Sequence, residues 1–287
     1  MKKINEESLS RFSEVPKLLL SKNPEIRWKN HESISREFEK EKWGSLLEIS
    51  NTKNTSVNSL EKIMHPYFEE KPFLYSGSIF LDQPLKISKL FLKESINFLK
   101  KNYNNFGCQS VVEIGAGYGR LLIPLVDALK KERPLKVIGT DFTSASGKIL
   151  NNLSKSLEYN IKTTTMDISG KSNYQDSLSI VNCSKPLVFS CQTVMYVPLL
   201  DNDFIELMRT WPDGIFCNIE PIYKKEPKKN LEKLQSKYIE VNDYNKNLQE
   251  LLKEYSQKGL IEIIYSSSNN VSENAFLPLQ TIVWRFI

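Results

Sequence analysis

The sequence predicts an α/β protein built on a mostly parallel sheet. Three observations support this class. An apolar strand ending in Ile114 runs directly into the glycine-rich turn Gly115–Gly119, and a second apolar strand ends in Asp141. Strand-like and helix-like segments then alternate as far as a closing pair of strands. Apolar strands separated by helix-sized segments are typical of parallel sheets, whose strands are buried on both faces.

Seven segments have the composition of strands. In chain order they are 111–114, 135–141, 161–166, 186–197, 214–221, 260–265 and 279–286. Only residues 266–278 separate the last two, which is too short for a helical crossover, so we expect an antiparallel pair there. Helices are predicted between strands and before the first one. They cover 84–101, 204–208, 231–241 and 248–255.

The part before the sheet is predicted to be a separate unit. We place a helical extension or lid at 1–84 and the core domain at 85–287. Residues 30–47 carry apolar side chains at helical spacing. An aromatic, partly irregular segment follows His65 and contains Tyr67, Phe73, Tyr75 and Phe80. These aromatic residues either cover a site or attach the extension to the core, and attachment is slightly favoured for any single one.

The glycine turn is the strongest functional signal. Glycine adopts positive φ and allows close approach to the main chain, so three alternate glycines suggest a ligand lying on the backbone. A dinucleotide fingerprint would have its third glycine where Arg120 stands. Glu113, two residues before Gly115, would also repel a pyrophosphate. The turn therefore favours a ligand with a positive centre over a nicotinamide dinucleotide, and a tight turn without ligand is the alternative.

Two further carboxylates follow predicted strands. Asp141 lies about twenty residues beyond the last glycine, where a ribose-binding acid stands in a βαβ unit. A carboxylate accepts hydrogen bonds from two neighbouring hydroxyls at once. Asp167 follows the third strand and is either a ligand-binding acid or a turn residue before Gly170.

The run Glu113-Ile114-Gly115-Ala116-Gly117-Tyr118-Gly119 resembles motif I of class I S-adenosylmethionine-dependent methyltransferases. The resemblance covers about 85–287 and implies a Rossmann-like seven-stranded sheet, mostly parallel with an antiparallel last strand. It implies S-adenosylmethionine as cofactor and S-adenosylhomocysteine as product. The cofactor-binding residues that it implies are Glu113, Gly115, Ala116, Gly117, Tyr118, Gly119, Asp141, Phe142, Met166, Asp167, Ile168 and Gln192.

The resemblance also assigns roles near the end of the third and fourth strands. Asp167 would accept from the adenine amino group, with Met166 or Ile168 packed on the ring. Gln192 and Tyr196 would line the floor between cofactor and acceptor, and packing at a strand end is the alternative for both. The chain lacks the Asn-Pro-Pro-Tyr run typical of enzymes that methylate nitrogen, and no histidine lies near Tyr196.

Methyl transfer to a hydroxyl requires a group that removes its proton. The catalytic candidates are His65, Glu220 and Tyr196. A turn residue before Pro66 is the alternative for His65, whereas Glu220 ends a strand at the sheet edge where ligands of α/β proteins bind. No pair of acids with an asparagine matches a metal-dependent enzyme, so we expect no metal.

The motif with its helical extension looks like bacterial sugar O-methyltransferases. The acceptor implied is a small molecule, most specifically a hydroxyl of a sugar or nucleotide-linked sugar. A methyltransferase acting on RNA or protein would carry the same cofactor motifs, and so would a non-catalytic S-adenosylmethionine-binding protein.

Composition limits the partners and the compartment. The net charge is +5, but the basic residues are dispersed, which does not favour nucleic acid. No apolar window has transmembrane length, and the first residues lack a signal-peptide run. Four cysteines without metal spacing predict a cytoplasmic protein without disulfides. The helical segments between 231 and 255 are expected to roof the acceptor site or to form a dimer face.

Overall fold

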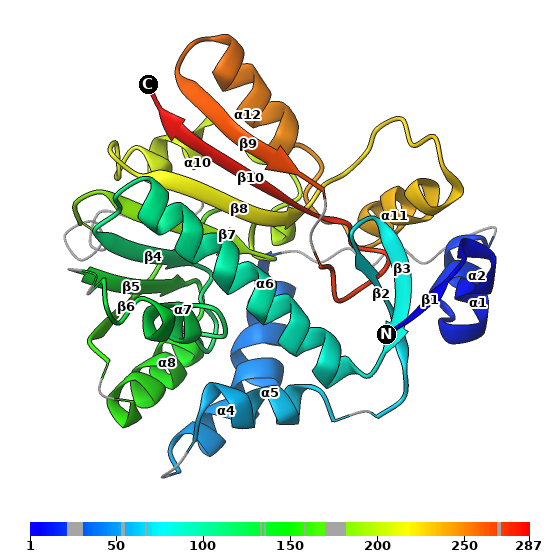
Figure 1. Ribbon diagram of the computed structural model, residues 1–287, viewed down its shortest axis with the longest axis horizontal. Helices are drawn as coiled ribbons and strands as arrows, with labels where there is room; N and C mark the ends of the chain where they lie inside the picture. Colours follow the sequence, from blue (N-terminus) through cyan, green and yellow to red (C-terminus); the bar gives the residue numbers. More distant parts are fainter. Residues whose placement is uncertain are drawn as a thin grey trace.

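The computed structural model describes residues 1–21, 31–52, 55–66, 68–132, 134, 136–157, 159–169, 182–268 and 271–287. At its centre is a seven-stranded sheet with the order β6-β5-β4-β7-β8-β10-β9 (Figure 1). The strands are β4 (Ser110–Ile114), β5 (Lys136–Asp141), β6 (Ile161–Thr165), β7 (Pro186–Cys191), β8 (Ile215–Pro221), β9 (Ile261–Ser267) and β10 (Leu279–Phe286). The first five are mutually parallel, and β10 is antiparallel to both of its neighbours. The predicted sheet is therefore confirmed.

The fourth strand is shorter than predicted. It ends at Cys191 instead of Val197, because Gln192 has φ of 53°, which takes the chain out of the extended conformation. The Gln192 N–H donates to the carbonyl of Ile219, and the 3₁₀ helix η3 (Val194–Tyr196) follows. The turn places residues 192–196 across the carboxyl end of the sheet.

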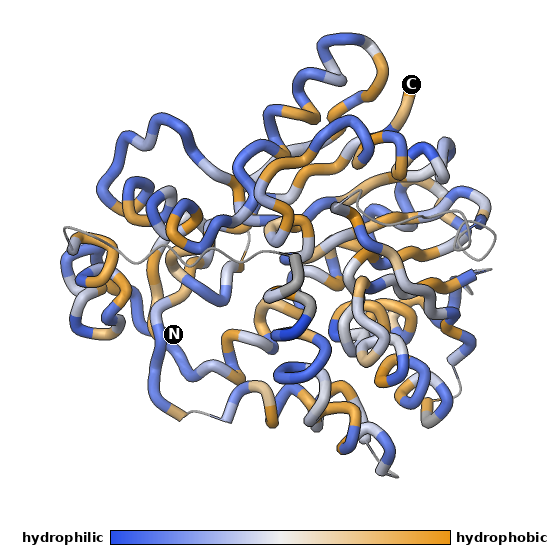
Figure 2. The backbone as a smooth tube through the Cα atoms, turned by 180° about the vertical axis from the view of Figure 1, so that it is seen from behind, coloured by the Kyte–Doolittle hydropathy of each residue, from blue (hydrophilic) through white to orange (hydrophobic). Residues whose placement is uncertain are grey.

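Helices cover both faces of the sheet. One face packs against α6 (Pro84–Asn105), α7 (Leu122–Ala128) and α8 (Ser144–Ser156), and the other against α10 (Asn202–Met208) and α12 (Leu248–Gln257). Successive side chains of a strand point to opposite faces, so Val111 joins the first cluster and Val112 the second. Figure 2 shows the hydrophobic residues concentrated along the central strands. Within the described residues, no helix combines the length and apolar character needed to cross a membrane.

The extension contains the predicted helices and also a small sheet that the sequence analysis missed. Its helices are η1 (Glu6–Ser8), α1 (Leu9–Phe12), α2 (Val15–Leu19), α3 (His31–Arg36), the π-helical η2 (Glu37–Lys42), α4 (Trp43–Ser50) and α5 (Val57–Met64). The strands β1 (Lys2–Ile4), β3 (Ser78–Asp82) and β2 (Lys71–Tyr75) form an antiparallel sheet in that order. Ser76 and Gly77 both have positive φ, as a tight two-residue hairpin requires, so this segment is regular rather than irregular.

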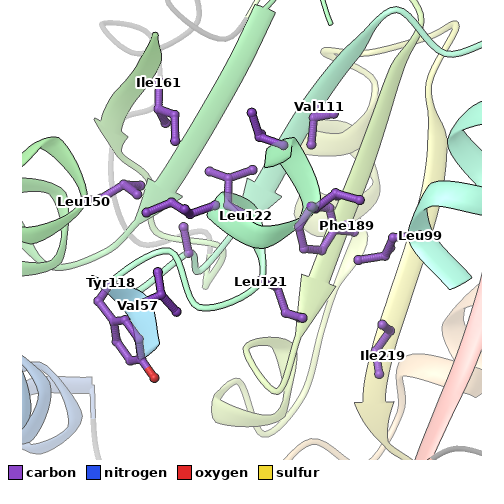
Figure 3. Close-up of a cluster of buried hydrophobic side chains, with 14 of the residues drawn as sticks. Val57, Leu99, Val111, Tyr118, Leu121, Leu122, Leu150, Ile161, Phe189 and Ile219 are labelled. Atoms are coloured by element: carbon purple, nitrogen blue, oxygen red, sulfur yellow. The ribbon is translucent and has the colours of Figure 1, made fainter. Parts of the chain in front are cut away.

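The extension shares a hydrophobic core with the central sheet. Phe38, Trp43, Leu46 and Leu60 belong to the same buried cluster as the strands β4 and β7. Figure 3 shows members of this cluster, among them Val57 of α5 with residues that follow the glycine turn. The helix α11 (Asn230–Val241), which lies between β8 and α12, packs instead against α2 and Leu9.

The small sheet is attached to the core by backbone hydrogen bonds. The N–H of Leu74 donates to the carbonyl of Ser272 at 3.0 Å, and the reverse bond measures 2.9 Å. Phe73 is completely buried, while Tyr75 and Phe80 are partly buried against the main core cluster. These aromatic residues thus attach the extension, as was slightly favoured. Tyr67 lies outside the described residues.

Candidate functional site

A cavity of about 670 Å³ lies at the carboxyl edge of the sheet, between the core and the extension. This volume falls in the range of small-molecule sites. The extension contributes Ile34, Phe38, Lys42, Trp43, Met64 and His65 to its wall. The predicted residues found on the wall are Glu113, Gly115, Ala116, Gly117, Tyr118, Asp141, Phe142, Met166, Asp167, Ile168, Gln192, His65 and Tyr196. Gly119 and Glu220 are not part of it.

The Cβ positions of the three glycines in the turn face different side chains. A Cβ at Gly115, where φ is 70°, would lie 2.2 Å from the Thr193 side chain. A Cβ at Gly119 would lie 2.5 Å from Leu150, so this glycine makes room for helix packing. Only at Gly117 does the Cβ position face a side chain of the extension, at 3.2 Å from Trp43. Gly119 does not line the cavity, and its predicted contact with a ligand stays a prediction.

Asp141 ties the glycine turn to the end of β5. Its Oδ2 accepts the Gly117 N–H at 3.0 Å, and its Oδ1 accepts from Thr143 N at 2.9 Å and Thr143 Oγ1 at 2.6 Å. Burial raises the pKa of Asp141, and the hydrogen bonds from Thr143 and Gly117 oppose that shift. The carboxylate is therefore fixed in position on the cavity wall.

Two other acids on the wall also bond to the main chain. Glu113 is buried, and its Oε2 accepts the N–H of Leu122 at 3.1 Å, at the start of α7. Burial raises the pKa of Glu113 well above its usual range. Asp167 accepts the N–H of Ser169 at 2.8 Å. It is thus a turn residue, as the alternative expected, and it also lies on the cavity wall; its contact with a ligand stays a prediction.

Glu220 lies beneath the turn that follows β7. Its carboxylate accepts from the Ser190 hydroxyl at 2.8 Å and from three consecutive main-chain N–H groups, at 3.1 to 3.3 Å, of residues 193–195. Burial raises the pKa of Glu220 to about 7. This position does not favour Glu220 as a base in contact with an acceptor. It indicates that Glu220 holds the turn that carries Gln192 and Tyr196.

Aromatic side chains from both parts of the chain meet on the cavity wall. The ring of Phe38 lies edge-on to Tyr196, with centroids 5.0 Å apart, and 5.8 Å from both Phe142 and Trp43. Lys42 Nζ lies 3.9 Å from the Phe38 centroid. Phe38 and Lys42 both lie in the π-helical segment η2, and such segments are frequent at functional sites. Burial raises the pKa of Tyr196, which keeps its phenol protonated.

A network of polar side chains joins three distant segments beside the cavity. Arg120 makes two parallel bonds of 2.7 Å to Glu273, in the loop between β9 and β10. Its Nε lies 2.8 Å from Glu61 Oε1 in α5. The hydroxyls of Tyr118 and Ser88 also donate to Glu61. Sequence reasoning noted Arg120 only as the residue in a glycine slot, because its partners are 59 and 153 positions away.

His65 lies at the edge of this network. Its Nε2 is 3.6 Å from Glu61 Oε2 and 4.0 Å from Glu273 Oε1. Burial lowers the pKa of His65, although both carboxylates act in the opposite direction. The imidazole is therefore mainly neutral at pH 7. Throughout the described ranges, no group of three or more His, Cys, Asp or Glu residues is arranged to hold a metal ion.

No family model and no curated protein sequence matches the chain. Among solved structures, the fold is similar to magnesium protoporphyrin IX methyltransferase from Synechocystis PCC 6803 with bound S-adenosylhomocysteine. The TM-score is 0.52 at 11% identity, over 89% of this chain and 98% of that one. This likeness shows that the two chains share a fold.

Two further structures match less well. A methyltransferase from Geobacter sulfurreducens in complex with S-adenosylhomocysteine has a TM-score of 0.42 at 14% identity, over 74% of this chain and 72% of that one. Geranyl diphosphate C-methyltransferase from Streptomyces coelicolor has 0.44 at 13% identity, over 67% and 77%.

Proposed function

We propose that this protein binds S-adenosylmethionine in the cavity and transfers the methyl group to a small-molecule acceptor. One observation carries the proposal. The turn after Glu113 and the carboxylate of Asp141 are joined by the bond to the Gly117 N–H, and together they line a ligand-sized cavity at the carboxyl edge of the sheet. Ligands of open α/β sheets bind at this edge. The motif resemblance and the shared fold support the same cofactor.

The residues present fit this cofactor. The main chain at 115–117 lines the cavity beside Thr193 and Trp43, and Asp141, on the same wall, is proposed to accept from ribose hydroxyls. Met166 and Ile168 offer apolar surface to adenine, with Asp167 for its amino group. When bound, the cofactor supplies a methyl group already activated by a sulfonium. The protein then has to align the acceptor and exclude water.

We assign proton removal to His65. The carboxylates of Glu61 and Glu273 lie near Nε2 and favour the tautomer that carries its proton there, which leaves Nδ1 to accept the acceptor's proton. Tyr196 stays protonated and orients the acceptor by hydrogen bonding. Glu220 acts through the turn that it holds. Each of these three predicted residues thus has a separate role in the proposal.

The acceptor is proposed to be a hydroxyl compound. A sugar or nucleotide-linked sugar is supported by the resemblance of the motif and its extension to bacterial sugar O-methyltransferases. The aromatic wall formed by Phe38, Trp43 and Tyr196 favours a second class, a hydroxylated aromatic ring, because aromatic pairs are favourable beyond the area that they bury. An acceptor panel that contains both classes separates them.

Calorimetry with S-adenosylhomocysteine tests the cofactor. The wild-type chain is expected to bind, and Asp141→Asn to bind about 10- to 100-fold more weakly, since hydrogen bonds to a charged group contribute roughly 1.5–3 kcal/mol. Asp203→Asn is the matched control, because Asp203 is exposed and lies outside the cavity. Absence of binding by the wild type at millimolar ligand, or equal affinity of the wild type and the Asp141 variant, would contradict the proposal.

A pH series tests the base once an acceptor is found. His65→Gln is expected to lower the methyl-transfer rate about 10²- to 10⁴-fold and to leave S-adenosylhomocysteine affinity unchanged. The wild-type rate should not change with pH near pH 7. It should decrease only at pH values below 6.5, the ordinary pKa of histidine, because burial lowers the pKa of His65. A wild-type rate that still rises between pH 7 and 9 would exclude His65.

A further inference from the structure

Trp43 carries a buried donor that no described residue satisfies. Its side chain is 8% exposed, and its indole Nε1 has no hydrogen-bond partner within the described part of the chain. A buried N–H without an acceptor costs about 1–3 kcal/mol, and native proteins supply an acceptor to nearly all such groups. Trp43 is also one of the residues that line the cavity.

The indole meets the glycine turn along the edge next to its nitrogen. Ring atoms Cζ2 and Cη2 lie 3.2 and 3.3 Å from the Cβ position of Gly117. Nε1 is separated from Cζ2 by one ring carbon, so the N–H edge adjoins the turn. Tyr118 and Phe38 hold the ring, with centroids 5.9 and 5.8 Å away. The unsatisfied donor therefore lies beside the glycine turn, which lines the cavity proposed for the cofactor.

The segment that carries Trp43 is fixed to the core on both sides of this residue. Before it, Glu39 accepts from the Ser144 hydroxyl at 2.6 Å and from Ala145 N at 3.2 Å, at the start of α8. After it, Asn152 donates to the hydroxyl of Ser50 at 3.0 Å. The segment that carries the indole is thus held in place by hydrogen bonds to residues outside the cavity wall. A donor preorganised in this way loses little freedom when it binds.

We propose that Trp43 is a cofactor-binding residue supplied by the extension. Its indole N–H donates to an oxygen of S-adenosylmethionine, which is either a ribose hydroxyl or the carboxylate of the amino-acid part. This inference rests on the proposed function and adds a role for the extension, which closes the cofactor site with a specific hydrogen bond as well as with apolar surface.

Calorimetry on Trp43→Phe is the first test, because phenylalanine retains an aromatic ring and removes the N–H. The affinity for S-adenosylhomocysteine should fall about 5- to 10-fold, as expected for one hydrogen bond. The unfolding midpoint in urea should fall only by the packing that the smaller ring loses, since the N–H has no protein partner to lose. The matched control is Trp284→Phe, whose N–H donates to Asn218 at 2.8 Å in the core. That control should lose stability and keep its ligand affinity.

The same titration with 5′-methylthioadenosine distinguishes the two oxygens. This compound keeps the adenosine and lacks the amino-acid part. If the ribose accepts the bond, Trp43→Phe weakens both ligands by the same factor. If the carboxylate accepts it, the variant and the wild type bind 5′-methylthioadenosine equally.

A spectroscopic readout uses the wild-type chain. It has four tryptophans, and hence four indole ¹⁵N–H resonances, of which the Trp43 signal is assigned by its loss in Trp43→Phe. S-adenosylhomocysteine should shift that signal downfield. Wild-type binding with equal affinity in Trp43→Phe, or with an unmoved Trp43 signal, would overturn this inference alone. Absence of wild-type binding would instead overturn the proposed function.

Discussion

The buried carboxylates on the two sides of the cavity are stabilised in opposite ways. In the core, Glu113, Asp141 and Glu220 accept hydrogen bonds from main-chain N–H groups and hydroxyls, and burial raises the pKa of each. At the junction with the extension, Glu61 and Glu273 share Arg120. Burial opposes ionisation of Glu273 too, but Arg120, together with Lys71 and His65, outweighs it and lowers the pKa. The hydrogen bonds that the three core acids accept thus do not offset their burial, whereas the cation beside Glu273 lowers its pKa in spite of burial.

Removal of Arg120 should have the largest effect. Arg120→Leu leaves Glu61 and Glu273 without their shared cation and should lower the free energy of unfolding by about 3 kcal/mol, at the lower end for a buried pair because Arg120 is partly exposed. Urea denaturation measures the change. The double variant Arg120→Leu/Glu273→Leu should cost less than the sum of the single variants. If the destabilisation of the double variant equals the sum for the two single variants, Arg120 and Glu273 are not coupled, and the contrast between the two groups of buried carboxylates does not hold.

The core carboxylates are tested by the pH dependence of stability, with Glu220 as the titrating group. The pKa of Glu220 is raised from 4.5 to about 7, so the folded chain holds a proton that the unfolded chain has lost in this window. Its contribution to stability is complete below pH 4.5 and is lost as the pH rises through 7. At about 1.4 kcal/mol per pKa unit, the wild type should lose roughly 3 kcal/mol relative to Glu220→Gln between pH 4 and 8. A constant difference between the two unfolding curves would exclude this titration.

Substitution of Glu39 should have the smallest effect on stability, and it separates the contribution of a charge from that of a hydrogen bond. Glu39 belongs to the extension and is partly exposed. Its carboxylate caps α8 by accepting from Ala145 N and the Ser144 hydroxyl. Glu39→Gln should cost about 0.3–1 kcal/mol, the usual contribution of a negative charge at a helix N-terminus. Denaturation at low and high salt measures it, and the cost should shrink at high salt. A salt-independent loss would assign the effect to the hydrogen bond rather than to the charge.

The part of the candidate site that lies at the ends of the parallel strands could be predicted from the sequence. Asp141 ends a strand next to the one that runs into the glycine turn, and the carboxyl ends of parallel strands meet at one edge, so their proximity could be predicted. The end of β7 was placed too late because the positive φ of Gln192 has no clear sequence signal. The hairpin at 71–82 did have one, since Ser-Gly between two apolar runs is a known turn pattern.

The other side of the site depends on contacts that a single sequence does not reveal. Trp43 reads as one more apolar residue of an amphipathic helix, and only the structure shows its unsatisfied N–H beside Gly117. Glu61 and Glu273 resemble any surface acid until the fold brings them to Arg120. The roles of such residues are decided by long-range packing, which local spacing does not encode.

The separation of Arg120 from Glu273 has a consequence for synthesis on the ribosome. The two residues are 153 positions apart, and at about 5–20 residues per second the interval between their appearances is roughly 8 to 30 s. During that interval β8 also has one unpaired edge, because its neighbour β10 is made later. The nascent chain thus carries an incomplete sheet and a guanidinium with only one of its two carboxylate partners, Glu61, for many seconds, and misassembly is favoured during this period.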